Sequence, residues 1–214
     1  MVELSLRLYK DEVSPANAWP AGMLLNAFDV DPGADERTLE LHAGELVDLG
    51  LRADLLVVSA RHNNYEPLSG TLIHSLEQQF GIRAGELPRA LDLSRSSIGA
   101  WVSPPLDELL PTSTRQQEST TRFRRIAVVE SAADIQDSSD SPWPVFRQLF
   151  SLLAVLPLQG IDCPVVATPL LSAGNQAVAP ERLFPDLLSC CRNGFRHRCQ
   201  TSSASSSSIA GATR

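Results

Sequence analysis

ADLLVVSA, residues 53–60, is an almost continuous apolar run with the length of one β-strand and with two adjacent valines. A strand that buried only one face would alternate between apolar and polar side chains, and this run does not alternate. The segment therefore predicts a strand that is covered on both faces, as in an α/β fold whose sheet carries helices on each side.

Two later segments repeat this pattern, and a helix signal follows each of the first two strands. RRIAVVES (residues 124–131) and PVVATPLL (residues 164–171) are the further buried strands. Apolar residues four positions apart predict an amphipathic helix from Leu68 to Phe80, ended by Gly81, and a second helix is predicted from Pro142 to Leu156. Strands separated by helices in this way indicate a sheet with helices on both faces.

The segments before residue 53 add shorter strands. Alternating apolar residues from Val2 to Leu8 and the segment Thr38 to His42 each predict one strand, and a second apolar stretch, Met23 to Phe28, lies between them. A last helix is predicted to begin at Pro180. We therefore expect a three-layer α/β/α fold with a mixed, mostly parallel central sheet.

The composition indicates one folded domain followed by a tail. Hydrophobic residues make up 43% of the chain and charged residues 20%, which is ordinary for a globular protein. From residue 196 onward the sequence is rich in serine and nearly lacks large apolar side chains, so burial there does not offset the entropy of ordering the backbone. We predict a domain over residues 1–195 and a disordered tail over residues 196–214.

Charge and hydropathy exclude several classes of partner. A net charge of -7 disfavours nucleic acid, because binding to a phosphate backbone requires a basic surface. A small phosphate ligand remains compatible, since backbone N–H groups bind anions without side-chain charge. No apolar run reaches the roughly 18 residues of a membrane span, and the N-terminus is charged, so we expect a cytoplasmic protein without a membrane partner.

The four cysteines of the chain are Cys163, Cys190, Cys191 and Cys199. They show neither paired CxxC spacing nor the spacing of a zinc site. They are predicted to be buried or idle thiols in a reducing compartment, and no metal or cofactor is expected.

Ligands of α/β sheets bind beyond the carboxyl ends of the strands, so the candidate positions are the loops after residues 60, 131 and 171. Asn63 and Asn64 in the first loop are either ligand contacts or turn formers that tolerate a left-handed backbone. His62 is interpreted as a polar surface residue, because the sequence shows no partner for it. Glu130 and Asp134, at the end of the second strand, are the carboxylates available for acid–base chemistry.

Three segments, in this order, resemble the macro-domain family. AGELVDLGLRADLLVVSA (residues 43–60) resembles the family's Gly-Asp-Ile-Thr turn and the strand after it. Residues 61–81 resemble the asparagine loop, the glycine-rich loop and the next helix, with Leu68, Ser69 and Gly70 where the family has two or three consecutive glycines. PVVATPLLSAGNQAVAPER (residues 164–182) resembles the buried strand, the Gly-Thr-Gly turn and the helix begun by proline. The resemblance covers residues 43–193, after which the family normally has one more strand.

The resemblance implies a site for ADP-ribose or a related NAD-derived nucleotide. In the family the acidic residue of the first turn accepts a hydrogen bond from the adenine amino group, and its counterpart here is Glu45. Asn63 or Asn64 would lie near the distal ribose, and the third segment would wrap the diphosphate with its backbone N–H groups. The implied ligand-binding residues are Gly44, Glu45, Ser59, Asn63, Asn64, Ser69, Gly70, Ser172, Ala173, Gly174, Asn175 and Gln176.

Binding or sensing of such a nucleotide is the first functional hypothesis. The alternative is a hydrolase that releases ADP-ribose from a protein or metabolite, in which Asn63 or Asn64 would be catalytic and would hold the attacking water. A third hypothesis, by analogy with other divergent macro domains, is a ligand-free interaction scaffold. The sequence carries no nucleophile elbow, Walker loop or zinc cluster, so binding and catalysis both stay open, as do protein partners.

Overall fold

We describe the fold from a computed structural model of the chain. The structure describes residues 4–10, 23–29, 37–43, 52–109, 123–131, 143–169, 171, 185 and 187–191. Several predicted features lie outside these residues: the tail 196–214, the start of the last helix at Pro180, and the site residues Gly44, Glu45, Asp134, Ser172, Ala173, Gly174, Asn175 and Gln176.

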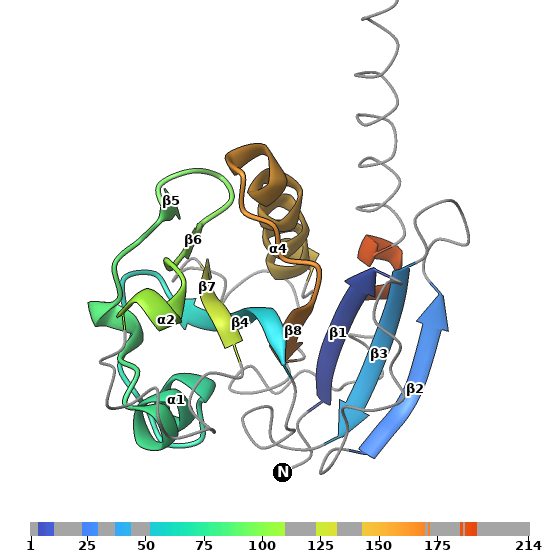
Figure 1. Cartoon of the computed structure of the whole chain (residues 1–214), viewed down its shortest axis with the longest axis horizontal. Helices are drawn as coiled ribbons and strands as arrows, with labels where there is room; N and C mark the ends of the chain where they lie inside the picture. The colour runs from blue at the N-terminus through green and yellow to red at the C-terminus, as the bar shows by residue number, and fades with distance from the viewer. Residues whose placement is uncertain are drawn as a thin grey trace, which may run out of the picture.

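A mixed sheet of eight strands runs through the molecule, with the N-terminal strands together at one side (Figure 1). Its order is β2-β3-β1-β8-β4-β7-β6-β5. The sequence predicts five of these strands, shows β2 only as an apolar stretch, and gives no signal for β5 and β6, whose three residues are too few for a periodic pattern. The strands are β1 (Leu4–Lys10), β2 (Met23–Asp29), β3 (Arg37–Ala43), β4 (Ala53–Arg61), β5 (Leu91–Leu93), β6 (Ala100–Val102), β7 (Phe123–Ser131) and β8 (Val166–Pro169).

Parallel pairing is confined to the centre of this sheet. β4 pairs in parallel with β7 on one side and with β8 on the other. The remaining pairings are antiparallel. The α/β class and the mixed sheet are confirmed, but the expectation of a mostly parallel sheet is wrong. A parallel pair needs a crossover of a dozen or more residues, and the links from β2 to β3 and from β5 to β6 are shorter, so these pairs are antiparallel.

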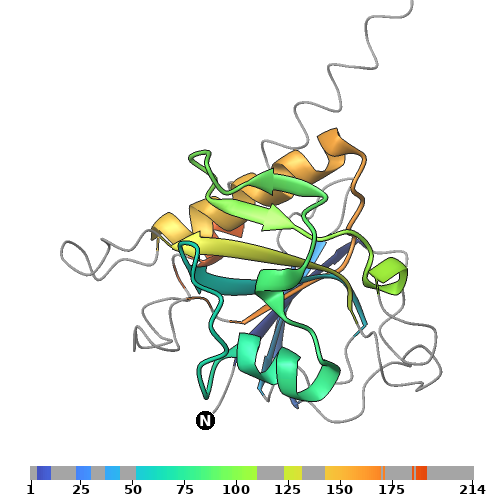
Figure 2. The ribbon, with the colours of Figure 1, turned by 90° about the vertical axis from the view of Figure 1, so that its left-hand side faces the viewer.

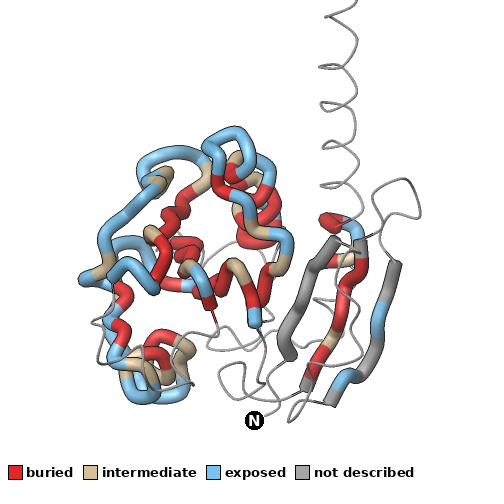
Figure 3. Tube along the Cα trace, viewed as in Figure 1, coloured by how far each residue is buried: buried red, intermediate tan, exposed pale blue. Residues whose placement is uncertain are grey.

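Helices cover both faces of the central strands. On one face, Leu55 and Val57 of β4 pack in a cluster with Leu149 of helix α4 (Trp143–Val155). On the other face, Leu56 of β4 packs in a second cluster with Leu76 of helix α1 (Leu72–Phe80). The two helices lie on opposite sides of β4 and β7 in Figure 2, and burial follows these elements in Figure 3. The prediction that residues 53–60 are covered on both faces is confirmed.

Local capping decides where α1 begins and ends. The Thr71 side chain accepts a hydrogen bond from the His74 backbone N–H and so caps the N-terminus. Gly81 ends the helix in the left-handed conformation at φ 66°, as predicted. The predicted start at Leu68 is wrong, because Leu68 lies outside the helix with 54% of its surface exposed. Its place in the leucine repeat does not bring it to the core.

The remaining short elements follow the chain around the sheet. α4 is continued by a short 3-10 helix, η4 (Leu156–Gln159), which Gly160 ends at φ 70°. Two further short helical elements are η2 (Ala84–Glu86), after α1, and α2 (Leu106–Leu109), after β6. No helix within the described ranges is long and apolar enough to cross a membrane.

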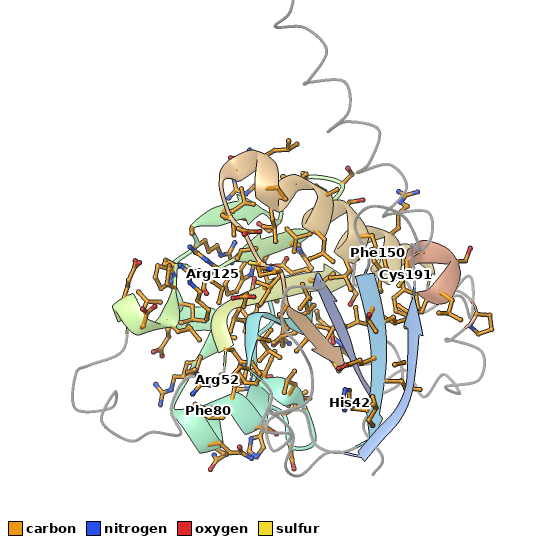
Figure 4. The ribbon with its side chains drawn as sticks, turned by 45° about the vertical axis from the view of Figure 1, so that its right-hand side comes forward. His42, Arg52, Phe80, Arg125, Phe150 and Cys191 are labelled. Carbon is orange, nitrogen blue, oxygen red and sulfur yellow. The ribbon has the colours of Figure 1, made fainter. Side chains whose placement is uncertain are left out.

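The N-terminal strands bury polar as well as apolar groups. On β3, Leu39 is fully buried, and Nε2 of buried His42 lies at hydrogen-bond distance, 3.0 Å, from Oε2 of buried Glu40, with His42 labelled in Figure 4. Residues 187–191 are helical, and buried Cys191 packs in the same cluster as Phe150 of α4 (Figure 4). Cys191 and Cys163 are free thiols.

Candidate functional site

The candidate site lies where β4 and β7 end side by side. The two strands are in parallel register, with Ala60 opposite Glu130 and Arg61 opposite Ser131. β4 leads into α1 on one face of the sheet, whereas β7 leads into α4 on the other face. Neighbouring strands whose connections leave toward opposite faces form a topological switch point, and open α/β sheets bind ligands there.

Glu130 is the centre of this site. Its side chain is only 1% exposed, yet it belongs to no apolar cluster. One carboxylate oxygen, Oε1, accepts a hydrogen bond from the Tyr65 hydroxyl. The other, Oε2, lies 2.7 Å from Nδ1 of His62. Burying a carboxylate is costly unless polar groups surround it, so both oxygens of Glu130 need polar or charged partners.

The contact between His62 and Glu130 is close but imperfectly aligned. Oε2 of Glu130 has no hydrogen bond of acceptable angle within the described part of the chain, although Nδ1 is at hydrogen-bond distance. The His62 side chain is 48% exposed, whereas the carboxylate is enclosed. Such contacts are often poorly aligned in a site without ligand and tighten when the ligand binds. We therefore treat the pair as an electrostatic contact, not as a formed hydrogen bond.

The backbone of Glu130 is held from both sides. Its N–H donates to the Gly99 carbonyl at 2.7 Å, and its own carbonyl accepts from Nε2 of Gln148 at 3.2 Å. Gly99 has φ 57°, and a Cβ added there would lie 2.7 Å from that Gln148 nitrogen. A residue without a side chain is thus required beside Glu130.

The loop after β4 presents His62 by a tight turn. The His62 backbone N–H donates to the Ser131 carbonyl at 3.1 Å, which ties the loop to the end of β7. Asn63 then adopts φ 56°, so the turn-forming interpretation of this residue is confirmed. Its side-chain amide nitrogen lies 2.9 Å from Nε2 of His62. A carboxylate only accepts hydrogen bonds, so the tautomer that suits both neighbours carries its proton on Nδ1, toward Glu130, and accepts from Asn63 at Nε2.

Tyr65 connects Glu130 to a second group of side chains. Its hydroxyl oxygen accepts hydrogen bonds from Arg89 at 2.9 Å and from the Trp101 indole at 3.2 Å. The Tyr65 and Trp101 rings meet edge to face at 6.0 Å, and the Arg89 guanidinium lies 5.0 Å from the Trp101 ring centre. Burial, followed by the hydrogen bond to Glu130, raises the pKa of Tyr65 above its ordinary value.

The Arg89 side chain is itself held by the turn that contains Asp92 and Ser94. It pairs with Asp92 at 2.9 Å. The hydroxyl and backbone N–H of Ser94 both donate to Asp92. The hydrogen bond from the Ser94 hydroxyl, and to a smaller extent the one from Arg89, lowers the pKa of Asp92 to about 2. A chain of polar contacts therefore runs from the exposed Asp92 turn through Arg89 and Tyr65 to the buried Glu130.

The structure brings only part of the predicted site together. Asn63 contacts His62, while the Asn64 side chain accepts from the Glu66 backbone N–H and so closes its own turn. Ser69 and Gly70 lie farther along the loop, just before the Thr71 cap of α1, and both are exposed. Ser59 is exposed near the end of β4.

Sequence reasoning missed several members of the site. His62 is exposed, as its interpretation as a polar surface residue predicts, but it has a partner that the sequence does not show, because its ring faces Glu130. Trp101 is buried, and its indole also donates a hydrogen bond to Tyr65. Arg89 is not singled out by the sequence, because nothing in its local pattern shows that it faces Tyr65. The available signal was the position of His62 and Glu130 at the ends of two strands that a parallel sheet could place together.

This arrangement places a buried carboxylate behind Nδ1 of an exposed imidazole whose Nε2 lies 2.9 Å from the Asn63 amide nitrogen. A buried carboxylate behind one ring nitrogen orients the ring and stabilises its protonated form, which leaves the other nitrogen to exchange protons with a ligand or water. Within the described ranges, no group of three or more His, Cys, Asp or Glu side chains could hold a metal ion.

Comparison of the chain with protein-family models, with curated proteins and with solved structures found no match.

Proposed function

We propose that the chain binds ADP-ribose or a related NAD-derived nucleotide outside the carboxyl ends of β4 and β7. The observation that carries this proposal is the polar loop of residues 61–71, which leaves β4 at the topological switch point. Ligands of open α/β sheets bind at that position because the connections diverge there and leave backbone groups unpaired.

The end of this loop suits a phosphate group. Gly70 has φ 80°, and none of the described atoms lies within 4 Å of the position that a Cβ would take. The loop then enters α1 through the Thr71 cap. The N-terminus of a helix attracts anions through its N–H groups and its dipole, and this attraction requires no positively charged side chain. An acidic chain can therefore still bind a diphosphate here.

The resemblance to macro domains supports the choice of ligand. Two of the three resembling segments contain β4 and β8, and these strands are parallel neighbours with Leu55 opposite Val166. The loops after both strands therefore leave from the same edge of the sheet. Helices on both faces of a mixed sheet also agree with a divergent macro-domain fold in three layers.

Calorimetric titration with ADP-ribose tests the proposal. We expect heat of binding and a higher melting temperature with ADP-ribose. Gly70→Ala should weaken binding by about 1–3 kcal/mol, because a methyl group enters the space assigned to the diphosphate.

Gly160→Ala is the matched control. Gly160 also has positive φ and open space around its Cβ position, but it lies at the end of η4. Both variants should lose similar stability, about 1–2 kcal/mol from the left-handed backbone, and only Gly70→Ala should lose affinity. If ADP-ribose and NAD at millimolar concentration produce neither heat nor a thermal shift, the proposal is wrong.

A further inference from the structure

The pairing of an enclosed carboxylate with an exposed imidazole is more than nucleotide binding requires. Binding a neutral sugar or a phosphate requires no proton transfer. At this site, however, Oε2 of Glu130 is buried without a well-aligned donor and faces Nδ1 of His62 at 2.7 Å. Oε1 is already used by Tyr65, so the carboxylate has one oxygen left for the imidazole.

We propose that His62 is the general base of a hydrolytic site for carboxylic esters, with Glu130 as its positioning residue. The geometry of three atoms carries this inference: the buried Oε2 oxygen, the Nδ1 nitrogen beside it, and the Nε2 nitrogen on the far side of the ring. An imidazole backed by a carboxylate is the arrangement that accepts a proton from a nucleophile and later returns it.

The proposed reaction needs no other reactant than water. Nε2 of His62 takes a proton from a water molecule, whose oxygen attacks the ester carbonyl carbon and forms the new C–O bond. The bond from that carbon to the alcohol oxygen then breaks, and the proton on Nε2 passes to the leaving alkoxide. The products are a carboxylic acid and an alcohol, and no atom is oxidised or reduced. The Glu130 carboxylate stabilises the imidazolium between these two steps.

Asn63 indicates where the water would lie. Its side-chain nitrogen is 2.9 Å from Nε2 of His62, at the end of an exposed turn. A water molecule in that place would be within reach of the base, and the displaced amide could hold it by a second hydrogen bond. This agrees with the role in holding water that the hydrolase hypothesis assigns to Asn63.

A neutral electrophile fits the charge of this position. The Glu130 carboxylate is buried close behind the ring, where charges are poorly screened, so it repels an anionic group that approaches the same nitrogen. The carbonyl carbon of an ester carries no net charge. The diphosphate of the proposed nucleotide is assigned to Gly70 and the start of α1, at the other end of the loop.

The test measures hydrolysis of p-nitrophenyl acetate by the full chain as release of p-nitrophenolate. His62→Gln should reduce the enzymatic rate on the order of 10²–10⁴-fold, the usual contribution of a general base. His74→Gln is the matched control, since His74 is a half-buried histidine on α1, and it should keep the wild-type rate. Added imidazole should restore activity to His62→Ala, an effect that a structural role of His62 would not produce.

Glu130 is tested by two substitutions of different chemistry. Glu130→Gln should lose activity, whereas Glu130→Asp, which keeps the carboxylate, should recover part of that loss. If Glu130→Gln does not fold, the exposed His62 still carries the test. A His62→Gln variant that keeps the wild-type rate overturns the inference.

Parallel titration with ADP-ribose separates this inference from nucleotide binding. Binding of ADP-ribose together with an unchanged rate in His62→Gln refutes only the general base. Hydrolysis that depends on His62, without ADP-ribose binding, supports the general base and refutes only the nucleotide proposal.

Discussion

Tyr65 donates a hydrogen bond to Glu130 across 65 residues of sequence. This bond joins the loop after β4 to the end of β7, and the same hydroxyl accepts from Arg89 and Trp101. Buried networks of this kind are stabilising only when every member is satisfied. One phenol oxygen thus links Glu130, Arg89 and Trp101, and its removal is a direct test of the arrangement.

Replacing Tyr65 with Phe should destabilise the protein by about 1–3 kcal/mol, because the buried carboxylate of Glu130 loses its donor. A double-mutant cycle with Glu130→Gln, measured by denaturant unfolding, should show coupling between the two positions of about 1–3 kcal/mol. Additive effects would mean that the two side chains do not interact in solution. Leu158→Ala is the control variant. Leu158 is 80% exposed, so this substitution should change the free energy of unfolding little.

Titration of the tyrosines should give Tyr65 a pKa above its ordinary value of about 10. The chain has two tyrosines, so absorbance of the phenolate in a Tyr9→Phe variant reports Tyr65 alone. Removing the charge in Glu130→Gln should move the midpoint downward, since Glu130 raises this pKa. An unshifted midpoint in the folded protein would contradict the buried hydrogen bond.

The same shift predicts how stability depends on alkaline pH. The folded state holds the Tyr65 proton more tightly than the unfolded state, so the resulting stabilisation is complete below the unfolded pKa of about 10. It should be lost as the pH rises through the higher folded pKa. Urea midpoints measured from pH 8 upward should fall less steeply in Tyr65→Phe than in the wild type.

Gly99→Ala should displace the Gln148 side chain and remove its hydrogen bond to the Glu130 carbonyl. We expect a loss of about 1–2 kcal/mol from the left-handed backbone and a further 0.5–1.5 kcal/mol, roughly, from the hydrogen bond. Gly81→Ala provides the comparison, because Gly81 has a similar φ but open space around it among the described atoms. If Gly99→Ala costs no more than Gly81→Ala, the crowding at Gln148 has no energetic effect.

The described cysteines should react slowly in the folded protein. Burial raises the pKa of Cys163 to about 11 and that of Cys191 to about 12, so only a very small fraction of either thiol is ionised at pH 8. In a Cys199→Ser variant, the remaining cysteines should react slowly with a thiol reagent in the folded protein. They should react rapidly once denaturant has unfolded it. Rapid reaction of the native variant would show that these side chains are accessible.

The sequence predicts the central elements well because their signals are local. A strand buried on both faces must be apolar along its central residues, and β4 and β7 show this at residues 55–58 and 126–129. The end of α1 at Gly81 is equally local, since a left-handed residue there needs no side chain. The start of α1 cannot be located in the same way. Leu68 fits the spacing of four residues between apolar side chains, but the helix begins later, after the Thr71 cap.

The candidate site likewise has some features that are local in the sequence and others that depend on strand pairing. The sequence by itself determined that polar residues follow buried strands, and so placed Asn63, His62 and Glu130 at strand ends. Only the tertiary structure decided that β4 and β7 are neighbours in a register that opposes Ala60 to Glu130. That pairing brings His62 and Tyr65 to one carboxylate, and Arg89 contacts the hydroxyl of Tyr65. The physical reason is that a hydrogen bond depends on ångström distances, which strand order and register determine, whereas a sequence pattern reports only how each segment divides between core and solvent.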